Sequence, residues 1–212
     1  MFLDLARIER IAEMPHLMGL LASRVGHFLN VEELARTTRL NSMTLHRYMT
    51  LLEALFMIYL LPAWHSHLGK RLVKSPKLYL NDTALQLFNL HVDTEKLLAD
   101  PYLMENVMEN FVVMELLKQC TWSGQNIRMY HYRDYRQSEV DIILEGPNGK
   151  LVAIEFKSSE TISAQDFKSL RLFLEENELN AFQGILLYAG SQTLAFGDKL
   201  TAVPLSALWE GF

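Results

Sequence analysis

The sequence predicts a two-part α+β protein, and three observations carry this prediction. Residues 1–80 have apolar side chains at helical spacing and ten Lys/Arg against six Asp/Glu, a net charge of +4. Residues 81–212 have ten Lys/Arg against nineteen Asp/Glu, a net charge of −9. In this second part, the order helix, three strands, helix, strand is typical of a mixed α/β core. We therefore expect two domains with different partners.

The composition excludes several classes of protein. The chain has 212 residues, of which half are hydrophobic, and its formal charge is −5. A lone Cys120 cannot form an internal disulfide, which favours a reducing compartment. The longest apolar stretch, residues 54–64, contains Pro62 and falls short of the ~20 residues that a membrane helix needs. We expect a cytoplasmic protein without a membrane partner.

The first part has the pattern of a helix-turn-helix followed by a hairpin. Apolar periodicity predicts helices over residues 17–26, 31–38 and 44–56, with a tight turn between the second and the third. The period then becomes extended over residues 57–62 and 70–80, on either side of a polar bend, which predicts a β-hairpin. Together these elements predict a winged-helix domain over residues 1–85.

Polar and cationic side chains of this domain are candidates for DNA binding. The third helix leaves four polar positions exposed, Thr44, His46, Arg47 and Thr50, and the second hairpin strand carries four cations. We expect these side chains to contact DNA phosphates. The alternative is a solvated basic edge strand that protects against aggregation. The candidate DNA-binding residues are Thr44, His46, Arg47, Lys70, Arg71, Lys74 and Lys77.

A polar segment over residues 86–100 is expected to connect the two domains. The second domain, residues 101–212, begins with a helix over residues 102–119. Strands are predicted over residues 128–132, 139–145 and 151–157, with a turn at 146–149. A helix over residues 163–176 and a strand over residues 184–188 complete the predicted core.

Alternation along the second and third of these strands places Asp141, Glu155 and Lys157 on one patch. Two carboxylates on neighbouring strands are the hard oxygen ligands that Mg²⁺ prefers. A lysine on the same face can orient a water and offset charge on a phosphate. Glu109 on the preceding helix is a further candidate ligand. The sequence therefore predicts a phosphodiester hydrolysis site with Asp141 and Glu155 as metal ligands.

The alternative for these residues is a half-buried strand pair with a structural salt-bridge network. Two other groups of side chains, the histidines and an aromatic and cationic group, are weaker candidates for a functional site. Histidines at no regular metal spacing make a zinc site improbable. Aromatic and cationic side chains near the first strand could stack on nucleic acid or only mark a solvated turn. This second group is Tyr130, Tyr132, Arg133, Tyr135 and Arg136.

The order of elements around Asp141 and Glu155-x-Lys157 resembles the restriction-endonuclease-like (PD-(D/E)xK) core. Further motifs extend the resemblance along nearly the whole chain: Lys70-Arg71, Lys74-Ser75-Pro76-Lys77-Leu78-Tyr79, Asp82-Thr83, Glu109-Asn110-Phe111-Val112, Tyr132-Arg133-Asp134 and Glu139-Val140-Asp141. With these, the chain resembles the domain of unknown function at the carboxyl end of bacterial and archaeal AAA+ ATPases. The resemblance implies a winged helix, a nuclease-like core and an associated AAA+ ATPase domain as a partner.

ATP binding belongs to the amino-terminal part of such relatives. The P-loop pattern is absent here, because Gly69-Lys70 is followed by Arg71 and Gly149-Lys150 by Leu151. We therefore expect no ATPase activity from this chain, which would be an excised carboxyl-terminal piece or a truncated gene product.

Three functions remain open. The first is a DNA-directed module with a Mg²⁺-dependent nuclease-like site. The second is an inert regulatory or protein-interaction domain of the ATPase, which the charge of −9 over residues 81–212 favours because it repels DNA. The third is DNA binding without cleavage.

Overall fold

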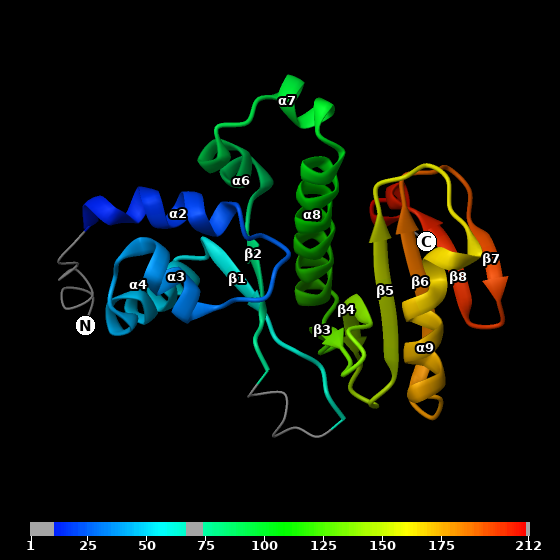
Figure 1. Cartoon of the computed structure of the whole chain (residues 1–212). Coiled ribbons are helices and arrows are strands. Elements are labelled where there is room, and N and C mark those ends of the chain that lie inside the picture. The colour runs from blue at the N-terminus through cyan, green and yellow to red at the C-terminus, as the bar shows by residue number, and fades with distance from the viewer. Residues whose placement is uncertain (1–10, 67–73, 211–212) are drawn as a thin grey trace. The chain divides into compact units, whose positions relative to one another are not determined.

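The computed structural model describes residues 11–66 and 74–210. Its chain, coloured by residue number in Figure 1, forms two compact units. Unit 1 comprises Met1–Leu60 and Ser75–Asn110, and unit 2 comprises Leu61–Lys74 and Phe111–Phe212. Helices and a mixed sheet confirm the predicted α+β class. No helix within the described ranges is long and apolar enough to cross a membrane.

Short helices form the first part of unit 1, and asparagine caps fix where two of them begin. Asn30 Oδ1 accepts a hydrogen bond from the Glu33 N–H at 3.0 Å, and Asn41 Oδ1 accepts one from the Thr44 N–H at 2.7 Å. Arg39, in the left-handed conformation with φ 55°, ends the first of these two helices. The elements are a 3₁₀ turn, Ile11–Glu13, followed by α2, Met14–Ala22, α3, Val31–Thr38, and α4, Ser42–Ala54.

A two-stranded sheet follows these helices. It pairs β1, Ile58–Leu61, with β2, Lys77–Leu80. Backbone after α2 also pairs with β2, because Gly26 N–H donates to Leu78 O at 2.8 Å and Leu78 N–H donates to His27 O at 3.0 Å. All four residues of β2 are buried. Of the second hairpin strand predicted over residues 70–80, residues 70–73 lie outside the described ranges.

Residues 86–100, expected as a connecting segment, contain helices of unit 1. These are most of α6, Thr83–Leu90, and all of α7, Thr94–Ala99. Asp82 and Asp93 cap their amino ends through side-chain oxygens, and α6 packs against α2. The helix α8, Pro101–Trp122, is longer than predicted; its residues up to Asn110 belong to unit 1 and the remainder to unit 2.

Unit 2 is built on a six-stranded sheet in the order β3-β4-β5-β6-β8-β7. The first three strands pair antiparallel, β5, β6 and β8 pair parallel, and β7 returns antiparallel to β8. The strands are β3, Arg128–Arg133, β4, Glu139–Glu145, β5, Leu151–Lys157, β6, Ala181–Tyr188, β7, Leu194–Gly197, and β8, Leu200–Pro204. The strands β7 and β8 were not predicted.

The helix α9, Lys168–Glu176, crosses from β5 to β6 and lies along this sheet (Figure 1). A 3₁₀ turn, Ala164–Phe167, precedes it, and another, Leu205–Leu208, follows β8. Leu170 and Phe173 of α9 are buried against the sheet in the core of unit 2. Trp64 packs edge-on against Phe173, with ring centroids 5.6 Å apart, and Tyr132 does so at 4.8 Å. One hydrophobic cluster of unit 2 therefore lies between α9 and one sheet face.

Candidate functional site

The strands β4 and β5 bring the two predicted carboxylates together. Their antiparallel register pairs Ile142 with Ile154, so one further step along it places Asp141 opposite Glu155. The Phe156 N–H donates a hydrogen bond to Asp141 Oδ2 at 3.2 Å. Backbone of β5 therefore fixes the Asp141 carboxylate beside the strand that carries Glu155.

A β-bulge in β4 lies at Asp141. Tyr130 pairs with Ile143 and Tyr132 pairs with Val140, so the single residue between them on β3 faces two residues of β4, Asp141 and Ile142. A bulge bends the strand and re-aims a side chain. Val140 and Ile143 consequently both join the core with α9, and the strict alternation predicted for β4 was wrong at this point.

The side chains of Asp141, Glu155 and Lys157 line one hollow of about 640 Å³, which we call the carboxylate hollow. Glu155 is buried, with 9% of its surface exposed, and Lys157 at the end of β5 is half-buried. The remaining walls come from Asp134, from residues 136–139 and from the amino-terminal half of α9; Tyr135 is not among the lining residues. The structure therefore gathers the three site residues that strand spacing predicted.

Glu109, the fourth candidate, does not line this hollow. It belongs to unit 1, whereas the other three residues belong to unit 2. The Tyr79 hydroxyl donates to Glu109 Oε1 at 2.7 Å, and Lys77 Nζ lies 3.5 Å from the same oxygen. Glu109 therefore contacts Tyr79 and Lys77 within unit 1, and its role as a further metal ligand stays a prediction.

The candidate DNA-binding cations occupy different environments. Lys77 is buried, with 3% of its surface exposed, because its ammonium faces Glu109. The expectation that Lys77 lies on an exposed basic strand is therefore corrected. Lys74 is exposed and its Nζ donates to Arg133 O at 2.9 Å. Lys70 and Arg71 lie outside the described residues.

Two of the three candidate DNA-binding positions on α4 are exposed, whereas the predicted exposure of Thr44 is not observed. His46 and Arg47 are exposed, whereas Thr44 is half-buried. His46 Nδ1 lies 2.8 Å from Ser42 O on the preceding turn. The surface of α4 therefore offers two exposed polar side chains.

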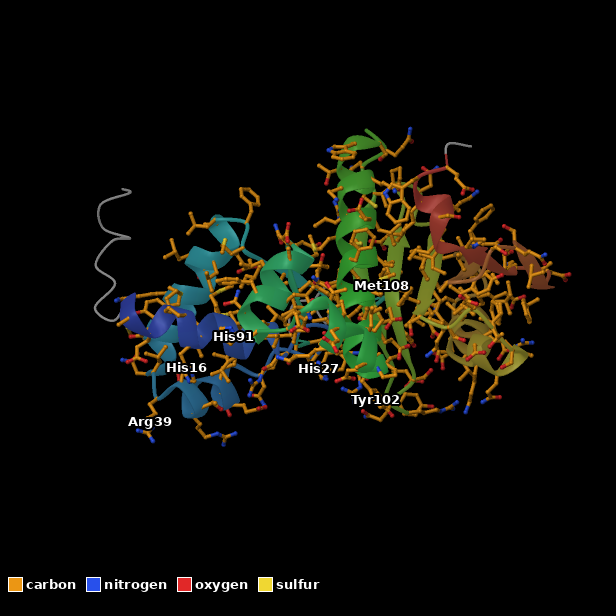
Figure 2. All side chains as sticks on the ribbon, turned by 90° about the horizontal axis from the view of Figure 1, so that it is seen from above. His16, His27, Arg39, His91, Tyr102 and Met108 are labelled. Carbon is orange, nitrogen blue, oxygen red and sulfur yellow. The ribbon has the colours of Figure 1, made fainter. Side chains whose placement is uncertain are left out.

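The donor set of the carboxylate hollow fits Mg²⁺. This cation is usually held by one or two carboxylates, with water and phosphate oxygens filling the remaining positions. Within residues 11–66 and 74–210, no group of three or more His, Cys, Asp and Glu side chains could hold a metal. The histidines labelled in Figure 2, His16, His27 and His91, come from three separate segments of unit 1.

A cysteine nucleophile does not fit this chain. Burial raises the pKa of the Cys120 thiol above its usual range. Because the thiolate is the reactive form, a raised pKa makes Cys120 a poor nucleophile at neutral pH. The carboxylate hollow is therefore the candidate site that the described residues support best.

Among the polar residues of the hollow that the sequence did not predict are two at the start of α9. Lys168 is the first residue of α9 and Ser169 the second, and both line the hollow. A lysine and a serine at the start of an amphipathic helix carry no pattern that separates them from an ordinary solvated helix end. Only the packing of α9 over β4 and β5 reveals their position.

Two protein-family models match different parts of the chain. Residues 104–208 match the domain of unknown function DUF4143, a domain found in AAA-ATPase-associated proteins. Residues 2–96 match a second domain of unknown function, DUF8612. The carboxylate hollow lies wholly within the residues that match DUF4143. The chain is therefore similar to DUF4143 in the part that carries the candidate site.

Two curated relatives are uncharacterized proteins of Mycobacterium. These are Mb2031c of Mycobacterium bovis and Rv2008c of Mycobacterium tuberculosis, each 27% identical over 193 residues. Each match covers 91% of this chain and 42% of the relative. The chain therefore spans less than half the length of these relatives.

One solved structure also aligns with the chain. It is the half-complex from a tetradecameric assembly of Thermococcus gammatolerans McrB AAA+ hexamers with bound McrC. The alignment covers 90% of this chain and 46% of that chain, with 13% sequence identity and a TM-score of 0.33. A TM-score of 0.33 does not establish a shared fold.

Proposed function

We propose that this chain is a DNA-directed module of an AAA+ ATPase system, and that Asp141, Glu155 and Lys157 form a Mg²⁺-dependent phosphodiester hydrolysis site. The observation that carries the proposal is that these three side chains line one hollow. The bulge at Asp141 adds support, since bulges are over-represented next to active sites.

Each residue of the hollow has a chemical role in this proposal. Asp141 and Glu155 hold the cation through carboxylate oxygens, and the hydrogen bond from Phe156 N–H orients Asp141. Mg²⁺, when bound, supplies positive charge to a phosphate oxygen and increases the acidity of a water. Lys157 orients that water and offsets the negative charge that develops on the phosphate.

Unit 1 supplies the DNA-docking part of the proposal as a winged helix. Its α3 and α4 are joined by a tight turn, and β1 and β2 follow. His46 and Arg47 on α4 are exposed, and Lys74, which is also exposed, belongs to unit 2. Because Lys77 is buried, the exposed charge that can contact phosphate is smaller than the sequence alone predicts.

Association with an AAA+ ATPase is supported by the similarity to DUF4143. The chain spans 42% of its curated relatives, and it lacks a P-loop. In the proposed system, ATP is bound by a separate AAA+ domain and not by this chain. The activity of such a whole protein is part of the proposal.

The experiment is a cleavage assay on linear, nicked and branched DNA with Mg²⁺ or Mn²⁺. We expect cleavage that requires the metal and falls by at least about 10²-fold in Glu155→Gln and Lys157→Ala, as when a transition-state donor is removed. Lys150→Ala is the matched control, because Lys150 is exposed and does not line the hollow. Intact DNA with every metal, together with no metal binding by calorimetry, would refute the nuclease proposal.

A second candidate, docking to the AAA+ ATPase with an inert hollow, is favoured by exposed apolar side chains in unit 1. Phe56, Phe88 and Tyr102 are 77%, 75% and 87% exposed, and Figure 2 labels Tyr102. Salt dependence separates the two candidates. DNA contact through phosphates weakens steeply as salt rises, whereas an apolar docking surface binds its protein partner with little dependence on salt.

A further inference from the structure

The rim of the carboxylate hollow carries two cations that its own acidic residues do not neutralise. Arg136 lies in the segment between β3 and β4, and Lys168 is the first residue of α9. Both side chains are exposed. Within the described ranges, neither forms an ion pair with a carboxylate. Both are therefore available to an anion from solution.

Two of the four carboxylates that line the hollow are already engaged at the rim. Glu139 Oε1 lies 3.2 Å from Arg133 Nε in an ion pair. Asp134 Oδ1 accepts a hydrogen bond from the Ser138 N–H at 2.7 Å. Arg136 and Lys168 therefore add two exposed positive charges to the lining of the hollow, which also holds the pair Asp141 and Glu155.

Between these strands, residues 134–138 form a closed turn, which we call the 134–138 loop. Its ends are joined by hydrogen bonds from Asp134 N–H to Ser138 O at 3.0 Å and from Ser138 N–H to the Asp134 side chain. Gln137 within it adopts φ 67°. The loop conformation is therefore set by its own hydrogen bonds, before any ligand arrives.

This loop presents an aromatic ring beside a cation. Tyr135 is 77% exposed, and the Arg136 guanidinium carbon lies 5.0 Å from the centre of its ring. Stacking between a base and an aromatic ring requires a base whose face is uncovered. In a duplex the neighbouring base pairs cover both faces, so a ring of this kind favours an unpaired base.

We propose that the rim binds a single nucleic-acid strand next to the carboxylates, with Arg136 and Lys168 on phosphates and Tyr135 stacked on an unpaired base. This inference rests on the proposed function and names its substrate class: a strand end, flap or single-stranded stretch. DNA and RNA share the phosphates and base faces that this rim recognises, and the experiment separates them.

The test is fluorescence anisotropy with labelled oligothymidylate, oligouridylate and a DNA duplex of equal length, without divalent metal. We expect both single strands to bind more tightly than the duplex. The single strand with the higher affinity shows whether the rim prefers DNA or RNA. Tyr135→Ala should weaken single-strand binding by about 5- to 150-fold. Arg136→Gln and Lys168→Gln should each reduce the slope of log K against log salt by about 0.7.

Matched controls separate these effects from general loss of charge or aromatic surface. Lys150→Gln removes an exposed lysine outside the hollow, and Tyr102→Ala removes an exposed tyrosine of unit 1. Single-strand binding that Tyr135→Ala leaves unchanged, a Tyr135→Ala loss that is equal for the duplex, or losses in the controls equal to those at the rim would overturn the inference.

Failure of this inference is distinguishable from failure of the proposed function, because binding is measured without metal and also in Glu155→Gln. Strand selectivity that depends on Tyr135, in a protein that neither binds Mn²⁺ nor cleaves DNA, would support the rim and refute the nuclease site. Metal-dependent cleavage without strand selectivity would support the nuclease site and refute the proposed rim.

Discussion

At the scale of single residues, Lys77 and Glu109 form a charged pair that stabilises unit 1 and is not available to DNA. Lys77 Nζ lies 3.5 Å from Glu109 Oε1, and the two side chains are 4% and 19% exposed. The Tyr79 hydroxyl donates to the same carboxylate oxygen. A cation in this position stabilises the joint between β2 and α8 within unit 1, and it is withdrawn from solvent.

Removing Lys77 is expected to lower stability. Lys77→Ala leaves the Glu109 carboxylate without its ammonium neighbour, and breaking a buried pair from one side costs about 3–5 kcal/mol. Because Glu109 keeps some exposure, we expect a loss of about 3 kcal/mol in the free energy of unfolding by urea. Lys74→Ala, at an exposed position, should change this free energy by less than about 0.5 kcal/mol. Equal losses in the two variants would contradict the structural role of Lys77.

Gly26 provides a second prediction on the same network. Its φ is +76°, and a Cβ there would lie 3.2 Å from the Asn106 Nδ2 and Glu109 Oε2 atoms. Gly149 also has a positive φ, +71°, but nothing lies within 4 Å of the Cβ position. In both Gly→Ala variants, the alanine must adopt a left-handed backbone conformation, which lowers stability by about 1–2 kcal/mol. We expect Gly26→Ala to lose more stability than Gly149→Ala on thermal or urea unfolding, because only it displaces neighbours. A difference of zero would show that the Glu109 carboxylate moves without cost.

At the scale of elements, the strand pair β4–β5 shows how far the sequence predicts the site. The bounds of both strands were predicted correctly, because alternating and continuous apolar runs end at clear turn residues. The bulge at Asp141 was not predictable, since it depends on how β3 pairs with β4. The contribution of α9 to the hollow was missed for a similar reason: it arises from packing between elements distant along the chain.

The contact between β3 and the end of α9 has a defined dependence on pH. Burial and then the hydrogen bond to Glu176 raise the pKa of Tyr132, whose hydroxyl donates to Glu176 Oε2 at 2.7 Å. The folded state therefore favours the protonated phenol. Its stabilising contribution is fully present below the unfolded pKa of about 10 and is lost as pH rises toward the higher folded pKa.

Tyr132→Phe tests this contact, because phenylalanine keeps the ring and removes the titrating group. We expect the free energy of unfolding of the wild-type protein to fall above about pH 10, and to fall less steeply in Tyr132→Phe. The measurement is urea unfolding at a series of pH values, followed by circular dichroism. Parallel profiles in the two proteins would contradict the assigned direction of the pKa shift.

At the scale of the whole molecule, charge separates along the chain, with +4 over residues 1–80 and −9 over residues 81–212. The structure also forms two units, and these units exchange segments: residues 61–74 belong to unit 2 and residues 75–110 to unit 1. Composition cannot reveal such an exchange, because it depends on backbone pairing such as that of Trp64 N–H with His131 O. The strands β7 and β8 were both missed; β7 is short and largely exposed, whereas β8 alternates between buried and half-buried residues.

The same asymmetry predicts how DNA binding responds to salt. Duplex affinity should fall as salt rises, and Arg47→Ala should weaken affinity and reduce the salt slope by about 0.9, the value for one phosphate contact. Glu53→Ala on the same helix is a control that removes the opposite charge. The measurement is anisotropy across a salt series. An affinity independent of salt would favour the protein-docking candidate.

The central claim is that Asp141 and Glu155 hold one divalent cation in the carboxylate hollow, and a crystal structure grown with Mn²⁺ tests it most directly. Anomalous scattering locates the ion independently of any assumption about its ligands. We predict one Mn²⁺ with an oxygen of each carboxylate within about 2.5 Å, since Mg²⁺–oxygen bonds are about 2.1 Å long. An empty hollow, or carboxylate oxygens more than about 6 Å from any shared ion position, would contradict the claim.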